Sequence, residues 1–354
     1  MKRLTLGDVC KKASSNIAQK DLQDKMGVYP IYGASGLIKQ VDFYQQDKEY
    51  IAVVKDGAGI GRTMLLPAYS SVIGTMQYLL PKEGIPIDIK YLFYAVEHMN
   101  LAKYFSGATI PHIYFKDYQK EPINIPDIDT QRKISRIFDK IDTLVTSRKE
   151  QRTKLDQIVM SRFIEMFGDP VENPHGFRKV ALSELAEIKI GPFGSLLHKE
   201  DYIEGGHPLL NPSHIVDGKV APDSKLTISD KKYDELEAYH LHIGDVVMGR
   251  RGEMGRCAVV PSEGFLCGTG SLLIRTKGEV TADYIQKIIS FPSFRKTIED
   301  MAVGQTMLNL NVPIVSKFQI IKPPIEVQKN YYKFVAQTDK SKYRQEKCIG
   351  FFQC

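Results

Sequence analysis

An internal repeat constrains the fold of this chain more than any single motif does. Three pairs of matching segments occur in the same order in the two halves of the sequence. They are Gly61-Arg62 with Gly255-Arg256 and Gly74-Thr75 with Gly268-Thr269, both 194 residues apart, and 123–126 with 320–323, 197 residues apart. This period is far longer than that of solenoid repeats. The sequence therefore predicts two related domains in tandem, which can be arranged about a pseudo-two-fold axis.

Composition adds limits but no function. The 354 residues are enough for two ordinary domains, and the net charge of +6 is compatible with nucleic-acid binding without indicating it. The five cysteines form no C-x-x-C pair, so we expect a reduced, cytoplasmic chain without a structural metal. The first residues contain no apolar core of a signal peptide, and no apolar run approaches the roughly 20 residues of a membrane span.

Each half begins with segments typical of β-structure. Residues 50–54 are apolar and partly β-branched and end at a glycine-rich loop. Residues 62–66 and 256–260 have the pattern of strands that return from such loops, while 88–105 and 282–301 have the apolar spacing of helices. These patterns predict an α+β chain with two β-rich domains.

A long helix is predicted after each domain, over 127–168 and over 323–354. The first would be roughly 60 Å long at 1.5 Å per residue, so it needs a partner helix, which the second can provide as an antiparallel coiled coil. The second helix is shorter, and we interpret its end as truncated or altered. The predicted contact residues between the helices are Ile134, Ile137, Ile141, Leu144, Leu155, Ile158, Tyr331, Val335, Ile349 and Phe352.

This organisation resembles the specificity subunit of type I restriction-modification systems over nearly the whole chain. The resemblance rests on the tandem plan, on the local forms at 4–8, 55–62 and 252–256, and on a Pro-x₄-Gln form that leads into each long helix. It implies two target recognition domains, 1–126 and 169–322, each of which recognises one half of a bipartite DNA target. It implies that the helices 127–168 and 323–354 set the spacing between them. The implied partners are double-stranded DNA, two methyltransferase subunits and restriction-translocase subunits, and no catalytic centre is implied in this chain.

Candidate DNA-contacting residues follow from side-chain chemistry, because Arg, Lys, Asn and Gln distinguish base edges best. Those beside the glycine loops, where backbone can approach a duplex, are Lys55, Arg62, Arg250, Arg251 and Arg256. Those in other predicted loops are Gln77, His112, Lys116, Asn211, His214, Asn309 and Asn311. The sequence does not sort them between phosphate and base contacts. The matched pair Arg62 and Arg256 is equally compatible with a structural ion pair in each domain.

Two other classes of function remain open. The first is a fused restriction or methylation enzyme, but no G-x-G-x-x-G, P-loop or H-E-x-x-H motif occurs, so we expect no cofactor. Gly57-x-Gly59-x-Gly61 is interpreted as a tight turn, and Asn211-Pro212-Ser213-His214, which partly matches the Asn-Pro-Pro-Tyr motif of amino-methyltransferases, as a proline turn. The second is a coiled-coil scaffold, including a homodimer, that binds only proteins. The predicted contact face of each helix has polar residues in its middle, Arg148 and Gln151 in the first and Thr338 and Lys342 in the second. Polar residues at such positions favour a specified register or partner over maximal stability.

Overall fold

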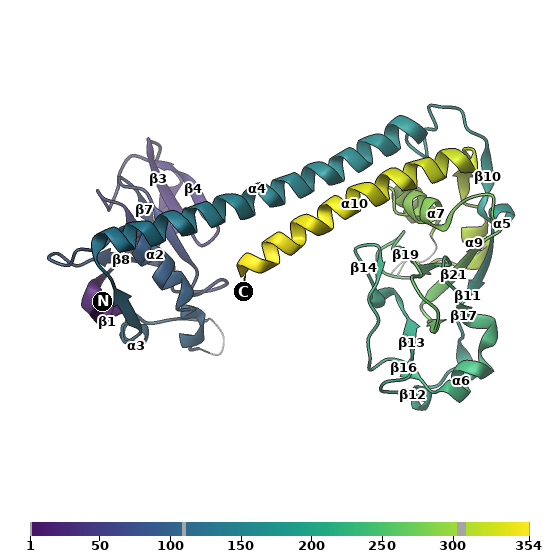
Figure 1. Ribbon diagram of the computed structural model, residues 1–354, viewed down its shortest axis with the longest axis horizontal. Coiled ribbons are helices and arrows are strands. Elements are labelled where there is room, and N and C mark those ends of the chain that lie inside the picture. Colours follow the sequence, from purple (N-terminus) through teal and green to yellow (C-terminus); the bar gives the residue numbers. More distant parts are fainter. Residues whose placement is uncertain (1, 108–110, 303–308, 354) are drawn as a thin grey trace. The chain divides into compact units, whose positions relative to one another are not determined.

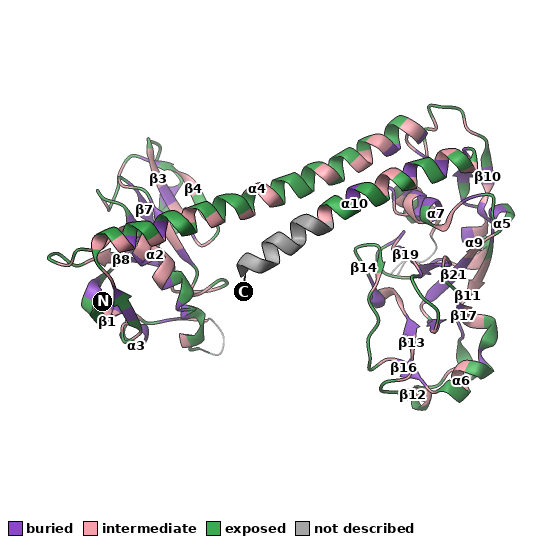
Figure 2. Cartoon of the chain, in the orientation of Figure 1, coloured by how far each residue is buried: buried purple, intermediate pink, exposed green. Residues whose placement is uncertain are grey.

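The computed structural model describes residues 2–107, 111–302 and 309–353, without the side chains of Ser195 and of residues 343–353. The chain divides into unit 1, Met1–Ser147, and unit 2, Arg148–Cys354, and each unit is described by itself. Figure 1 shows that both combine sheets with helices, as the sequence predicts for an α+β chain. In Figure 2 the buried residues gather on the sheets, whereas the described parts of the two long helices are mostly exposed or intermediate.

Unit 1 is built on a four-stranded antiparallel sheet. Its strands, in spatial order, are β2 (Cys10–Ser14), β8 (Met76–Pro81), β5 (Tyr50–Val54) and β6 (Thr63–Leu66). All five residues of β5 are buried, because Ile51 and Val53 face one core cluster while Tyr50, Ala52 and Val54 face another. A strand covered on both faces has a continuous apolar sequence. The prediction of a strand over 50–54 is confirmed.

Smaller elements complete unit 1. The strand β3 (Tyr29–Gly33) lies between β4 (Gly36–Val41), which is antiparallel to it, and β7 (Ser71–Val72), which is parallel to it. The first strand, β1 (Lys2–Thr5), pairs with β9 (Pro122–Ile125) and leads into the short helix α1 (Leu6–Val9). The remaining helices are α2 (Ile89–His98) and α3 (Phe115–Tyr118).

Unit 2 repeats the order of the main sheet of unit 1. Its antiparallel strands are β11 (Ala186–Ile190), β21 (Ser271–Thr276), β18 (Val246–Gly249) and β19 (Cys257–Val259). As in unit 1, a short pair, β10 (Lys179–Ala181) with β22 (Gln319–Ile321), leads into a one-turn helix, α5 (Leu182–Leu185). The same strand order in both units agrees with the sequence repeat.

The second sheet of unit 2 is larger than that of unit 1. Its strands are β12 (Tyr202–Ile203), β16 (Thr227–Ile228), β13 (His207–Leu210), β20 (Phe265–Cys267) and β17 (His240–Leu241). The parallel contact of β13 with β20 matches that of β3 with β7 in unit 1. The hairpin of β14 (Ile215–Val216) with β15 (Lys219–Val220) and the helix α6 (Asp230–Glu235) belong to unit 2 as well.

Two helix predictions differ from the structure. The segment predicted as one helix over 282–301 is two helices, α7 (Ala282–Ile289) and α8 (Pro292–Met301). Pro292 begins the second, and its ring disfavours a helical conformation of the preceding residue, Phe291, whose φ of −68° and ψ of 137° are extended. The helix predicted over 88–105 ends at His98, and Asn100 then adopts a left-handed φ of 48°.

The long helices α4 (Ile128–Phe167) and α10 (Ile325–Gln353) begin with the same joint. The fully buried Gln131 accepts a hydrogen bond from Asp88 N at 2.8 Å and donates one to Pro126 O at 2.9 Å. The fully buried Gln328 accepts from Thr281 N at 3.0 Å and donates to Pro323 O at 2.9 Å. Asp88 and Thr281 are the N-cap residues of α2 and α7. The Pro-x₄-Gln form therefore links each long helix to the domain before it.

Within unit 2 the end of α4 packs beside α10. Tyr331 Oη donates to Val159 O at 3.2 Å, and Lys342 Nζ lies 2.7 Å from Asp156 Oδ1. Since the later residue of α10 meets the earlier residue of α4, the two segments run in opposite directions here. Phe163 and Phe167 are fully buried in the core of unit 2.

The predicted helix contact residues differ in exposure. Tyr331 is buried, and Ile134, Ile141, Leu155 and Val335 are partly buried. Ile137, Leu144 and Ile158 are 57%, 50% and 50% exposed, whereas Val159 and Met160 pack against the core of unit 2. A 3.6-residue turn drifts from a strict heptad along a long helix, which moves the inner face by one position near Ile158. The side chains of Ile349 and Phe352 lie outside the described residues.

None of the helices that the structure describes is long and apolar enough to cross a bilayer.

Candidate nucleic-acid interface

A glycine-rich turn follows the central strand in both units. In unit 1, Gly61 N donates to Val54 O at 2.8 Å, and Val54 N donates to Arg62 O at 2.9 Å. In unit 2, Gly249 N donates to Arg256 O at 2.9 Å. Gly61 has a φ of 78° and Gly255 a φ of 75°, which only glycine adopts readily. The turn interpretation of 57–61 agrees with this geometry, and the strand β6 rather than a helix follows it.

A second segment joins each turn, which the sequence did not predict. In unit 1, Asp56 forms an isolated β-bridge with His112, and Ile113 N donates to Lys55 O at 3.0 Å. In unit 2, Arg251 forms the same bridge with Asn309, and Leu310 N donates to Arg250 O, also at 3.0 Å. Each bridge is a single pair outside the named strands, so the second segment contacts the turn at one point and does not extend the sheet. We call each turn with its bridged segment a bridged loop pair.

The polar side chains of the unit 1 loop pair are partly exposed. Asp56 contacts the ring of His112 and lies 3.1 Å from Lys55 Nζ, with about a quarter of each side chain accessible (26%, 24% and 24%). Lys116 is exposed, with its ammonium 5.1 Å from the centre of the Tyr114 ring. These groups offer both donors and an acceptor at the surface.

Arg62, at the end of the same turn, donates from Nη1 to Ala34 O at 2.9 Å. This contact serves the fold, although the residue as a whole remains exposed.

The unit 2 loop pair is richer in arginine. Arg250 Nε donates to Leu310 O at 3.0 Å, which holds the loop pair together, and burial lowers the pKa of its guanidinium. Arg251, the next residue, is exposed. The two arginines therefore differ, since one supports the loop and the other projects from the bridge towards solvent.

Arg256 stands where unit 1 has Arg62, but its contacts are different. Its Nη2 lies 2.8 Å from Glu253 Oε2, and Arg295 Nη1 lies 2.6 Å from the other oxygen of that carboxylate. The hydrogen bond from Arg256 lowers the pKa of Glu253. Arg295 was not among the sequence candidates because only the folded chain brings α8 to this turn.

Four candidates serve the interior or the backbone. Gln77 is 3% exposed and donates to Tyr118 Oη, and His214 is 5% exposed with Nδ1 2.7 Å from Leu209 O. Asn311 caps α9 (Val312–Ser316) by accepting from Ile314 N at 2.9 Å. Asn211 Oδ1 accepts from Gly270 N at 3.4 Å. Burial of Gln77 and His214 gives a physical reason to leave both out of the proposed interface.

The arrangement offers hydrogen-bond donors and positive charge on irregular backbone. Within the described residues, no three His, Cys, Asp or Glu side chains are close enough to hold a metal ion. Guanidinium, imidazole and amide groups of this kind suit recognition of phosphates and base edges.

The comparisons with known proteins agree with this architecture. The family model described as the type I restriction modification DNA specificity domain matches residues 1–157 and again residues 174–348. The chain therefore belongs to this family, with two copies of the domain.

Two curated relatives are specificity subunits of type I restriction enzymes. The chain is 28% identical to the EcoprrI subunit of Escherichia coli over 155 residues, which span 42% of this chain and 38% of that protein. It is 19% identical to the MjaVIII subunit of Methanocaldococcus jannaschii over 297 residues, which span 79% of this chain and 69% of that protein.

Two solved structures have the same fold. The S subunit of a type I restriction-modification system from M. genitalium superposes with a TM-score of 0.59 at 15% identity, over 99% of this chain and 92% of that one. A chain from a structure of an assembled type I restriction-modification system superposes with a TM-score of 0.62 at 14% identity, over 99% and 94%. At these identities the likeness shows the fold alone.

Proposed function

We propose that this chain recognises a bipartite DNA sequence for a type I restriction-modification complex and performs no chemistry itself. Residues 1–126 bind one half of the target and residues 169–322 the other. The helices 127–168 and 323–354 pack as an antiparallel coiled coil that fixes the spacing between the halves. Two methyltransferase subunits and the restriction-translocase subunits supply the catalytic centres.

The observation that carries this proposal is the recurrence of the bridged loop pair with different side chains. The backbone contacts match between the units, whereas the bridged residues are Asp56 with His112 in one and Arg251 with Asn309 in the other. A constant scaffold with variable polar groups suits two related domains that recognise different base sequences. Phosphate contacts position such a domain, and base contacts give the sequence preference.

The remaining candidates take roles that follow from their exposure. Arg62 and Lys116 in unit 1 and Arg251 in unit 2 are exposed cations. Lys55 and Arg256 are partly exposed and each lies beside a carboxylate, but both keep part of their charged side chains at the surface. Arg250, Asn211 and Asn311 hold the local backbone through their hydrogen bonds. We therefore assign direct DNA contact to the first group and a positioning role to the second.

Selection from a random duplex library tests this function. The chain is reconstituted with methyltransferase subunits, and bound DNA is recovered and sequenced at a stated salt concentration, because phosphate contacts make affinity salt-dependent. The proposal predicts a split motif, two short specific blocks around a spacer of constant length. Recovery of no motif favours a protein-binding scaffold, and a single continuous block contradicts the two-domain proposal.

A methyl-transfer assay addresses the fused enzyme. The purified chain is incubated with duplex DNA and labelled S-adenosylmethionine, with and without methyltransferase subunits. We expect label on DNA only when those subunits are present. Label transferred by the chain alone contradicts a purely recognising role.

A further inference from the structure

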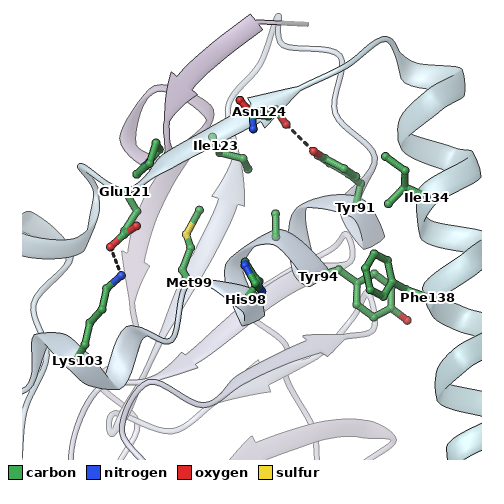
Figure 3. Close-up of a pocket in the computed structure, with 12 residues that line it drawn as sticks. Tyr91, Tyr94, His98, Met99, Lys103, Glu121, Ile123, Asn124, Ile134 and Phe138 are labelled. Carbon is green, nitrogen blue, oxygen red and sulfur yellow. Dashed lines mark hydrogen bonds and ion pairs between the residues drawn. The ribbon is translucent and has the colours of Figure 1, made fainter. Parts of the chain in front are cut away.

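Exposed aromatic side chains occur in two different settings. In unit 1, Tyr94 and Phe138 stack on each other with ring centres 4.9 Å apart, in the groove between α2 and α4 that Figure 3 shows, so each ring covers part of the other. In unit 2, Phe193 is 61% exposed, and its ring contacts no other aromatic ring of the described residues. A single exposed apolar side chain is ordinary, so the surroundings of Phe193 decide what it can bind.

Phe193 lies in a loop that leaves the main sheet of unit 2 beside the bridged loop pair. Directly after β11, Gly191 N donates to Ser271 O at 3.1 Å at the start of β21. On the other side of β21, directly after β18, Arg250 N donates to Gly270 O at 2.9 Å. The loop of Phe193 and the turn that begins at Arg250 therefore leave the same end of the sheet. Since neighbouring strands are about 4.8 Å apart, the backbones at Gly191 and Arg250 are separated by roughly 10 Å.

The backbone on both sides of Phe193 is restricted. A Cβ at Gly191 would lie 2.1 Å from Gly268 O, so only glycine allows this close approach. Pro192 follows, and its ring holds φ at about −65°. Gly194 has a φ of 63°, which favours glycine. Phe193 is thus held at the surface by the residues before and after it.

Unit 1 has no aromatic side chain at the matching place. Ile17 stands three positions beyond the end of β2, as Phe193 stands three positions beyond the end of β11. Ile17 is partly buried and packs against the cluster that contains Leu22 and Ile31. The two units therefore differ at this end of the sheet, as they do in their bridged loop pairs.

The charges near Phe193 indicate the class of its partner. Arg251 leaves the same end of the sheet and is exposed. The carboxylate of the same turn, Glu253, is already paired with Arg256 and Arg295. An apolar ring beside an exposed cation suits the major groove of DNA, where thymine presents its 5-methyl group among polar base edges. Phenylalanine is one of the side chains that contact this methyl group.

We propose that Phe193 is a specificity-determining residue of unit 2, whose ring packs against the 5-methyl group of a thymine in the half-site that Arg251 contacts. This inference rests on the proposed function, because Phe193 has this role only if unit 2 binds a half-site of DNA. At a rise of about 3.4 Å per base pair, a separation of roughly 10 Å places the thymine about three base pairs from the base that Arg251 contacts.

The test uses the reconstituted complex and a duplex that carries the selected split motif. Each thymine of the motif is replaced, one at a time, by uracil, which removes only the 5-methyl group. We expect one thymine whose replacement weakens binding of the unchanged chain roughly fourfold, the effect of burying one methyl-sized apolar group. The same replacement should leave binding by Phe193→Ala unchanged. This thymine should lie in the block that Arg251→Ala relaxes.

The matched control is Ile243→Ala. Ile243 is 64% exposed in the same unit, but it precedes β18, whose other end leads into Arg250. This variant should lose affinity for the uracil duplex as the unchanged chain does. Because Phe193 is exposed, Phe193→Ala should leave the melting temperature nearly unchanged, which is checked first.

Three results overturn the inference while the proposed function stands. They are the absence of any uracil effect that depends on Phe193, a sensitive thymine in the block that His112→Ala relaxes, and unchanged DNA selection by a Phe193→Ala chain that no longer retains methyltransferase subunits. The last result assigns the ring to a protein partner. Recovery of no split motif contradicts the proposed function itself, and the inference with it.

Discussion

The buried glutamine in the first turn of each long helix, Gln131 in α4 and Gln328 in α10, should contribute strongly to stability. Gln328→Ala removes the acceptor of Thr281 N–H and the donor to Pro323 O, at a residue that is fully buried. A buried polar group without a hydrogen bond costs roughly 1–3 kcal/mol. The carbonyl of Pro323 finds another partner more easily than the N–H of Thr281 does, so its share of the cost is smaller. We therefore expect a loss of about 2–4 kcal/mol, localised where α7 and α10 begin.

Hydrogen exchange read by mass spectrometry measures this loss locally, which matters because a chain of two units need not unfold in one step. Peptides that cover 278–290 and 323–331 should lose protection in Gln328→Ala, while peptides from unit 1 should not. Lys329→Ala is the matched control, since that side chain is 53% exposed and pairs with Glu326 of the same helix. Equal protection in the two variants, or a loss spread over both units, refutes the reasoning. Gln131→Ala should give the mirror result in unit 1.

Three further outcomes are expected. Gly61→Ala should destabilise unit 1 more than Gly57→Ala in thermal melts, since both glycines have positive φ but only a Cβ at Gly61 would collide with the backbone at Ala102. A Cβ at Gly57 would meet no described atom within 4 Å, and equal melting temperatures of the two variants contradict this prediction. Asp245→Asn should lower the free energy of unfolding of unit 2 by about 2 kcal/mol, because Arg275 loses the carboxylate that lies 2.7 Å away. The loss is smaller than for a fully buried pair because Arg275 is 36% exposed to solvent, and denaturation curves identical to those of the unchanged chain contradict the prediction. DNA affinity of the reconstituted complex should fall steeply between about 50 and 200 mM salt, with a log–log slope that reports the number of phosphate contacts, and a flat dependence rules out the proposed mode of binding.

The sequence predicted the tandem plan, the mixed class and the central strand over 50–54. The tandem plan follows from segments that match at a nearly constant offset, and the strand follows from an apolar run that ends at a glycine-rich loop. The split of 282–301 into two helices was missed, although Pro292 carried the signal. The shifted inner face near Ile158 was not visible, because it depends on how Phe163 and Phe167 enter the core of unit 2.

The candidate interface was predicted less well than the fold. Residue type selected Arg251 and His112, which form the isolated bridges, and it also selected Gln77, whose side chain is buried against Tyr118. The bridges from 56 to 112 and from 251 to 309 join positions far apart in the sequence, so patterns within a short segment cannot predict them. Aligning 107–113 with 304–310 at the offset of 197 would have shown that His112 and Asn309 correspond.

Selective relaxation of one half of the DNA target is the most direct test of the central claim. Library selection is repeated with Arg251→Ala and, separately, with His112→Ala. Each loss of a base contact is worth about 1–3 kcal/mol, or roughly five- to 150-fold in preference at the contacted position. We predict that each variant relaxes a different block of the split motif and leaves the other block and the spacer unchanged. Loss of preference in both blocks from either single substitution contradicts recognition by two separate units.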